Sequence, residues 1–144
     1  MLCFLHNLVM GHFKSHPEVE ISLTYFRKYF NLNDWMLQHC APVQEDNPYD
    51  VIVTKGNLKD LLKEIEPIAQ ELNKFNYNQI SYYEDNGYPQ EFVERFYDTE
   101  FTPSCSNTFA AGHKLVKLYR NVLVMIEMLE DNEEDFYITF YSSF

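Results

Sequence analysis

The clearest periodic pattern in the chain is helical. Seven apolar residues recur at intervals of one or three positions, namely Leu58, Leu61, Leu62, Ile65, Ile68, Ala69 and Leu72. This spacing places apolar side chains along one side of an α-helix, and that side must be buried against another part of the protein. Thr54 is a candidate N-cap for this helix. Pro67 lies inside the pattern, so we expect a kink or a restart there.

A second helical pattern runs from about His113 to Leu129. One face is formed by Leu115, Leu118, Val122, Ile126 and Leu129. Further apolar residues at positions 116 and 123–125 widen this face, which predicts a central, buried helix.

The last segment has a different period. Within residues 136–141, Phe136, Ile138 and Phe140 alternate with the other three side chains, which predicts a strand. Residues 51–53 form a second, β-branched strand before the first helix. There is neither a strand–helix–strand rhythm nor a glycine-rich phosphate loop. We therefore expect an α+β fold, with several helices packed on a small antiparallel sheet that includes the C-terminal strand.

The remaining segments give weaker patterns. We expect a short helix within residues 2–13 and a helix over residues 22–40 that Ser22 would cap. Proline, asparagine and aspartate residues predict a loop at 41–50. Residues 75–90 and 102–112 are also expected to be loops or irregular, and residues 91–97 a short helix.

The length of 144 residues fits one domain. Met10 is a possible natural start, which would make the first nine residues an appendage, and Pro17 separates this piece from the next. We interpret residues 1–15 as a possible N-terminal appendage and residues 16–144 as a single α+β domain. No segment has the pattern of a signal peptide or the length of a membrane span.

The charge is strongly acidic. The chain has 22 acidic and 11 basic residues, a net charge of −11 and a pI near 4.7. This balance argues against direct binding of nucleic acid or of an anionic membrane, because both need a basic surface. It favours solubility, or a basic protein as partner.

The cysteines and histidines give no strong motif. Cys3, Cys40 and Cys105 are widely spaced and odd in number, which predicts reduced thiols in a cytosolic protein. Cys105 is the better nucleophile candidate, but a structural cysteine is the preferred interpretation. His12 and His16 have the spacing of a helical metal pair without a third ligand. We predict no catalytic residue, no metal and no cofactor.

One stretch has the residue types of an anion site. Hydroxyl side chains precede the long helix, and three cations follow within it. Helix N-termini attract anions, so this region predicts binding of a small phosphorylated ligand such as a nucleotide. The alternative is ordinary helix capping beside a solvated basic edge. The candidate ligand-binding residues are Thr102, Ser104, Ser106, Asn107, Thr108, His113, Lys114, Lys117 and Arg120.

Two further groups are candidate protein contacts. Residues 127–135 carry six carboxylates, which could mimic a nucleic-acid backbone or form a solvated helix end. Tyrosines cluster at positions 82–97, where they could form a contact surface or fill the core. The residues chosen for protein contact are Tyr82, Tyr83, Tyr88, Glu130, Asp131, Glu133 and Glu134.

Three short motifs occur together. They are Tyr25-Phe26-Arg27-Lys28 followed by Trp35, Val53-Thr54-Lys55 before the leucine-rich helix, and the terminal Tyr141-Ser142-Ser143-Phe144, with a loop containing Pro103 before the last. Over residues 22–144 this order resembles a family of small acidic proteins of tailed bacteriophages, of unknown function. Asn33 and Phe144 stand where that family often has His and Trp.

The resemblance implies a phage accessory protein in the host bacterial cytoplasm that binds and neutralises a host component, with no enzymatic step. It would either sequester a nucleotide signal of host defence through residues 102–120, or occupy a basic host protein through residues 127–135. A small enzyme acting on a nucleotide, or an immunity protein or antitoxin, are the alternatives. A homodimer is compatible with the apolar helix and the tyrosines.

Overall fold

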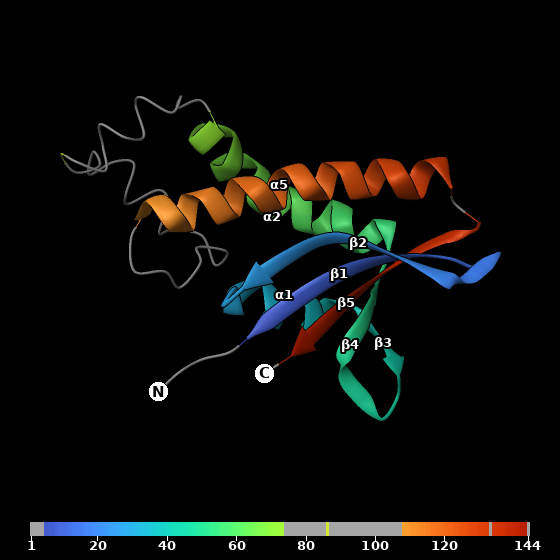
Figure 1. Ribbon diagram of the computed structural model, residues 1–144. Coiled ribbons are helices and arrows are strands. Elements are labelled where there is room, and N and C mark those ends of the chain that lie inside the picture. Colours follow the sequence, from blue (N-terminus) through green and yellow to red (C-terminus); the bar gives the residue numbers. More distant parts are fainter. Residues whose placement is uncertain (1–4, 74–85, 87–107, 133, 144) are drawn as a thin grey trace.

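The computed structural model describes residues 5–73, 86, 108–132 and 134–143 (Figure 1). The elements, in chain order, are β1 (His6–Phe13), β2 (His16–Arg27), α1 (Phe30–His39), β3 (Ala41–Gln44), β4 (Asn47–Val53), α2 (Lys55–Asn73), α5 (Thr108–Asp131) and β5 (Phe136–Ser143).

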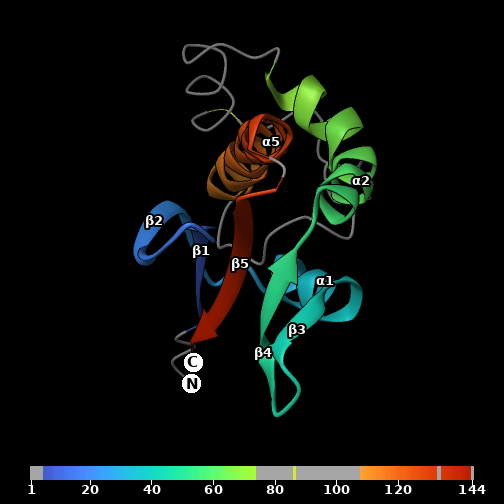
Figure 2. The same ribbon diagram turned by 90° about the vertical axis from the view of Figure 1, so that its right-hand side faces the viewer.

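The five strands form one antiparallel sheet in the order β2-β1-β5-β4-β3. The strand β1 therefore lies between β2 and the C-terminal strand β5. Helices α2 and α5 pack against each other over one side of the sheet, as both views show (Figures 1 and 2). The expected α+β fold, with an antiparallel sheet that includes the C-terminal strand, is confirmed.

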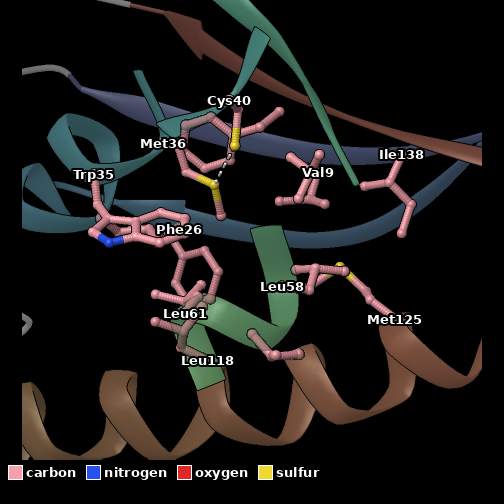
Figure 3. Packing of buried hydrophobic residues seen from close by; sticks show 14 of the residues in the cluster. Val9, Phe26, Trp35, Met36, Cys40, Leu58, Leu61, Leu118, Met125 and Ile138 are labelled. Atoms are coloured by element: carbon pink, nitrogen blue, oxygen red, sulfur yellow. Dashed lines mark hydrogen bonds between the residues drawn. The ribbon is translucent and has the colours of Figure 1, made fainter. Parts of the chain in front are cut away.

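The hydrophobic core lies between the helices and this side of the sheet (Figure 3). Leu58, Leu61 and Ile65 of α2 are fully buried there, together with Leu115 and Val122 of α5. The sheet contributes Val9, Val51, Val53, Phe136, Ile138 and Phe140, and α1 contributes Leu32, Trp35 and Met36. The main apolar faces read from the sequence for α2 and α5 are thus buried, but the expectation of a central, buried helix is wrong for α5, because Leu123 and Val124 are 40% and 54% exposed.

Helix α2 begins with reciprocal hydrogen bonds. The backbone N–H of Asn57 donates to Thr54 Oγ1 over 3.1 Å, and Asn57 Oδ1 accepts from the Thr54 N–H over 3.0 Å. This arrangement is that of a capping box, with Asn57 in the place of the usual Glu or Gln. The prediction that Thr54 is the N-cap is confirmed. Pro67 lies within an uninterrupted helix, so the expected restart is not present.

The helix expected within residues 2–13 is wrong, because His6–Phe13 forms β1. The first part of the chain is mostly apolar, but its burial alternates along most of the strand as it does in a sheet. The interpretation of residues 1–15 as an appendage also needs correction where the structure describes them, since β1 is paired on both sides. Gly11 lies close to the β5 ring of Phe136, where a Cβ atom would approach its Cζ to 2.5 Å.

The helix expected over residues 22–40 is confirmed only in its second part. Residues 22–27 belong to β2, and only Phe30–His39 is helical, so Ser22 caps no helix. A β-bulge in the pairing with β1, between Val9 and Met10, inserts one extra residue into β2 near Leu23. This insertion breaks the two-residue alternation and leaves a spacing that fits a helix. Lys28, with a φ of 58°, turns the chain from β2 towards α1.

The loop expected at residues 41–50 is also wrong, because β3 and β4 form a hairpin there. Asn47, the first residue of β4 after the turn, explains the error. Its side chain donates to Asp50 Oδ2 over 3.0 Å and accepts from the Tyr49 N–H over 3.2 Å, so polar residues at this position form a tight hairpin. The strand predicted at residues 51–53 is confirmed as the end of β4.

Helix α5 begins at Thr108, five residues before the expected start. The expected loop at 102–112 is therefore wrong from Thr108 onward. The predictions for residues 75–85, 87–90, 91–97 and 102–107 lie outside the described residues. None of the described helices is both long enough and apolar enough to cross a membrane.

Candidate functional site

The second side of the sheet, opposite the helices, carries the most unusual set of side chains. Residues directly opposite each other on antiparallel strands share a face, so the strand registers define rows of neighbours. The first row is Glu20, His12 and Tyr137; the second is Ser22, Met10, Thr139 and Ile52; the third is Tyr25, Leu8, Tyr141 and Asp50; the fourth is Arg27, His6 and Ser143. We call these four rows the open face. Among the described residues, no helix packs against it (Figure 2).

His12 is the best-held side chain of the open face. Its Nε2 lies 2.7 Å from Thr139 Oγ1, and its Nδ1 lies 3.8 Å from the Glu20 carboxylate. The imidazole stacks on the ring of Tyr137, with centroids 4.7 Å apart and planes at 16°, and meets Tyr141 edge-on. These contacts leave His12 only 8% exposed on a face that has no helix over it.

A second histidine–tyrosine pair lies at the other end of the open face. His6 Nδ1 and the hydroxyl of Tyr25 form a hydrogen bond, and their rings stack with centroids 5.7 Å apart. Leu8, next to Tyr25 in the third row, is 42% exposed. The open face thus combines ordered rings with accessible apolar surface.

The hydroxyl, imidazole and carboxylate of Thr139, His12 and Glu20 occur in the order that activates a nucleophile. Catalysis would require the hydroxyl to reach a substrate, but Thr139 is 1% exposed. A nucleophile also needs donors for the developing oxyanion. Thr139 is paired with Met10 and Ile52 in the middle of the sheet, where ladder bonds occupy backbone donors. The group of Thr139, His12 and Glu20 is therefore suited to holding the His12 ring in place. The open face as a whole is suited to binding a partner.

The described residues contain no cluster of three or more His, Cys, Asp or Glu side chains that could hold a metal ion. His12 and His16, the pair noted in the sequence, lie on β1 and at the start of β2 instead of on one helix. His12 faces Thr139 and Tyr137, while His16 is 3.4 Å from the exposed carboxylate of Glu18.

The predicted ligand site is only partly described. Thr102, Ser104, Ser106 and Asn107 lie outside the described residues. Thr108, His113 and Lys114 are placed in the first turns of α5, but nothing is described of their side chains.

Lys117 and Arg120 are the two members of that site whose side chains are described. The Lys117 ammonium donates to the backbone carbonyl of Tyr25 over 2.7 Å and lies 4.8 Å from the centre of the Phe26 ring. Lys117 therefore ties α5 to β2, and this role uses the charge that a phosphate would need. Arg120 is exposed on the same helix.

The predicted acidic contact residues lie at the end of α5. Glu130 and Asp131 are exposed in its last turn, Glu134 is exposed in the turn that follows, and Glu133 is outside the described residues. Lys59 Nζ is 3.8 Å from the Glu130 carboxylate, with both side chains about half exposed. A solvated pair of this kind contributes little to stability, so most of the acidic surface remains available for a partner.

Asp135 has a structural role at the end of this acidic run. Its carboxylate accepts hydrogen bonds of 2.7 Å from the Ser15 hydroxyl and from the Ser15 N–H. The side-chain bond, then the backbone bond, lower the pKa of Asp135, and His16 and Lys14 act in the same direction. Asp135 thus joins the β1–β2 turn to the start of β5.

Asn33 is buried in a polar group of three. Its Oδ1 accepts from Asn7 Nδ2 over 2.9 Å and from the Ser142 hydroxyl over 2.6 Å. These bonds link α1 to β1 and β5 on the helix side of the sheet. A buried amide with two partners is a structural feature.

Cys40 is a structural thiol. It is buried at the end of α1 beside Met36, and burial raises its pKa to about 12. A thiol of this kind stays protonated and unreactive at neutral pH, as the cysteine pattern predicts. Cys3 and Cys105 lie outside the described residues.

Sequence reasoning missed the open face. Tyr82, Tyr83 and Tyr88, which it selected, lie outside the described residues. The available signal was the alternation of His6, Leu8, Met10 and His12 with buried neighbours. It was hidden because the segment was interpreted as a helix, which distributes the same residues around its circumference.

Comparisons with protein families, with curated proteins and with solved structures gave no significant match.

Proposed function

We propose that this chain is a non-enzymatic phage accessory protein that binds and neutralises a basic host protein, with the open face of its sheet as the contact surface. The phage context rests on the motifs of residues 22–144. The contact surface rests on a single observation, which is that a sheet face rich in tyrosine, histidine and exposed leucine has no helix packed on it among the described residues.

Tyrosine and histidine rings support binding for a physical reason. They present a large contact area with few rotatable bonds, and here Tyr137 and Tyr25 are already ordered by stacking on His12 and His6. Preordered side chains lose little conformational entropy when a partner binds. Protein interfaces are enriched in such residues at their centres.

The charge of the face and of the chain supports a basic partner. Glu20 and Asp50 lie at opposite sides of the open face, flanking the rings. Aromatic rings with nearby carboxylates attract lysine and arginine side chains through cation–π and ionic contacts. The net charge of −11 would accelerate association with a basic protein. The acidic end of α5 would add to the same field.

A nucleotide signal as ligand is the second candidate, because the N-terminal turns of α5 follow a stretch rich in hydroxyls. The engagement of Lys117 with Tyr25 weighs against it. The two candidates predict opposite responses to charge reversal. Lys114→Glu would abolish nucleotide binding and spare protein binding, whereas Glu130→Lys with Glu134→Lys would weaken protein binding alone.

Native mass spectrometry of the protein purified from a bacterial host lysate tests the proposal. A co-purified basic protein that is lost at high salt is the expected result. A small phosphorylated ligand retained by the wild type and lost in Lys114→Glu would contradict it and support the nucleotide candidate. Turnover of such a ligand would support the enzyme alternative.

A further inference from the structure

The two edges of the sheet are built differently. One edge, β3, has four residues with Pro42 at its second position, whereas the other edge, β2, has twelve residues with Pro17 at its second position, so ten residues follow its proline. Short strands and prolines protect an edge from pairing with another chain, and a long edge strand exposes unpaired backbone groups. No described strand pairs with the outer side of β2. This edge therefore has the capacity to accept a further strand.

The first half of β2 alternates in chemistry. Glu20 lies on the open face opposite His12, and Ile21 lies opposite Gly11 on the helix side, where it is 36% exposed. The pairing with β1 shifts between Glu20 and His16, and within this irregular stretch Glu18 is exposed and Val19 is 40% exposed. The edge thus presents two acidic side chains and, at Val19 and Ile21, an accessible apolar row.

Helix α5 extends the apolar row. It runs alongside β2 (Figure 1), and Asn121 Nδ2 donates to Thr24 Oγ1 over 2.9 Å. Val124 follows Asn121 by three positions, so it lies on the same side of the helix. Its side chain is 54% exposed. An exposed valine on the β2 side of α5 has no packing role in the core and adds to the surface beside the edge.

We propose that the outer edge of β2, at residues 16–22, binds an extended segment of the partner protein in which basic and apolar side chains alternate. Backbone hydrogen bonds would add this segment to the sheet as a sixth strand, and alternate side-chain contacts would give specificity. Its basic side chains meet Glu18 and Glu20, and its apolar side chains meet Val19 and Ile21. The inference rests on the proposed function, because it identifies which part of a basic partner is bound.

Charge disfavours a second copy of the chain as the occupant in the registers centred on Val19 and on Glu20. If two β2 strands paired antiparallel about Val19, Glu18 of one copy would lie opposite Glu20 of the other. Pairing about Glu20 would place the two Glu20 side chains opposite each other. Like charges directly opposite on neighbouring strands are destabilising, whereas a basic strand neutralises both carboxylates.

The test uses the full-length protein and an acetylated, amidated eight-residue peptide of alternating lysine and valine, titrated by two-dimensional NMR. Saturable shifts of the backbone amides of residues 18–22 and of Val124 are expected. A peptide with N-methyl groups on alternate residues keeps the side chains but lacks the N–H groups that would donate to the backbone of β2. Its affinity should therefore be at least about tenfold lower than that of the unmodified peptide. Glu18→Gln should weaken binding by about threefold, while Glu64→Gln, an exposed change on α2, should have no effect.

Three results would overturn the strand-addition proposal. They are no saturable binding, equal affinity for the N-methylated peptide, or shifts centred on Leu8 and Tyr141 in place of residues 18–22. None of these results bears on whether the open face captures a host protein, because that capture is measured in a separate experiment. Conversely, peptide binding at β2 with no basic host partner captured would leave the edge site intact and reject the proposed function.

Discussion

Thr139 fixes the imidazole of His12 from the neighbouring strand, with Nε2 2.7 Å from the hydroxyl. The two residues are diagonal neighbours, since His12 lies opposite Tyr137 and Thr139 lies opposite Met10. Together with the stacking of His12 on Tyr137, this bond sets the orientation of the ring at one end of the open face.

Thr139→Val tests this bond. Valine keeps the branched shape and removes the hydroxyl, so the nearly buried His12 nitrogen loses its partner. The free energy of unfolding should fall by about 1–2 kcal/mol, measured by urea denaturation. Thr139→Ser retains the hydroxyl, so the ¹⁵N shift of His12 Nε2 should change in Thr139→Val alone. An unchanged shift in Thr139→Val would show that the bond does not form.

Gly11→Ala should destabilise the sheet. The added Cβ would lie 2.5 Å and 2.7 Å from two ring carbons of Phe136, which is closer than atoms can pack. The Phe136 ring is buried, so the expected loss is about 1–3 kcal/mol in thermal or urea unfolding.

Gly56→Ala is the matched control for that change. Its Cβ would meet nothing closer than Thr54 Oγ1 at 3.7 Å, and alanine favours the helix. We expect it to be neutral or stabilising by up to about 1 kcal/mol. Equal effects of the two substitutions would contradict the packing described for Gly11.

The capping box of α2 can be dissected by a double-mutant cycle. Thr54→Ala and Asn57→Ala should each cost about 1 kcal/mol, because each leaves backbone or side-chain groups of the first turn without a partner. Their reciprocal bonds predict that the double variant loses less than the sum of the two. Additive losses in urea denaturation would mean that the residues act independently.

The bonds from Ser15 make stability depend on the charge of Asp135. They lower its folded pKa, so the contribution is fully present above the unfolded pKa and is lost as the pH falls through the lowered folded value. The melting temperature of Asp135→Asn should therefore lie below that of the wild type at pH 6. The two should converge as the pH falls below the lowered folded pKa of Asp135. A constant difference from pH 6 to pH 2 would exclude this linkage.

Much of the fold follows from periodicity. The faces of α2 and α5 and the strand β5 could be predicted because long or regular patterns make burial on one side unavoidable. The N-terminal strands could not be, because Gly11 and the bulge near Leu23 disturb their alternation for tertiary reasons. The close approach of Gly11 to Phe136 depends on a residue more than a hundred positions away.

The candidate site was less accessible to sequence reasoning. Its rows join β2, β1, β5 and β4, so neighbours such as Glu20, His12 and Tyr137 are brought together only by the strand order. For Lys117, the sequence pattern predicted a ligand-binding role that the structure does not favour. It has the residue type and spacing of a ligand-binding cation, but the carbonyl of Tyr25 already accepts its hydrogen bond.

The role of the open face is tested most directly by quantitative capture from host lysate with two matched variants. Leu8 and Leu123 are exposed to nearly the same extent, 42% and 40%, but Leu8 lies on the open face and Leu123 on the helix α5. The account predicts that Leu8→Arg reduces capture of the basic partner at least about tenfold, because it places a cation and a steric obstacle at the contact surface. Leu123→Arg should capture as well as the wild type. Equal capture by all three proteins, or a loss confined to Leu123→Arg, would contradict it.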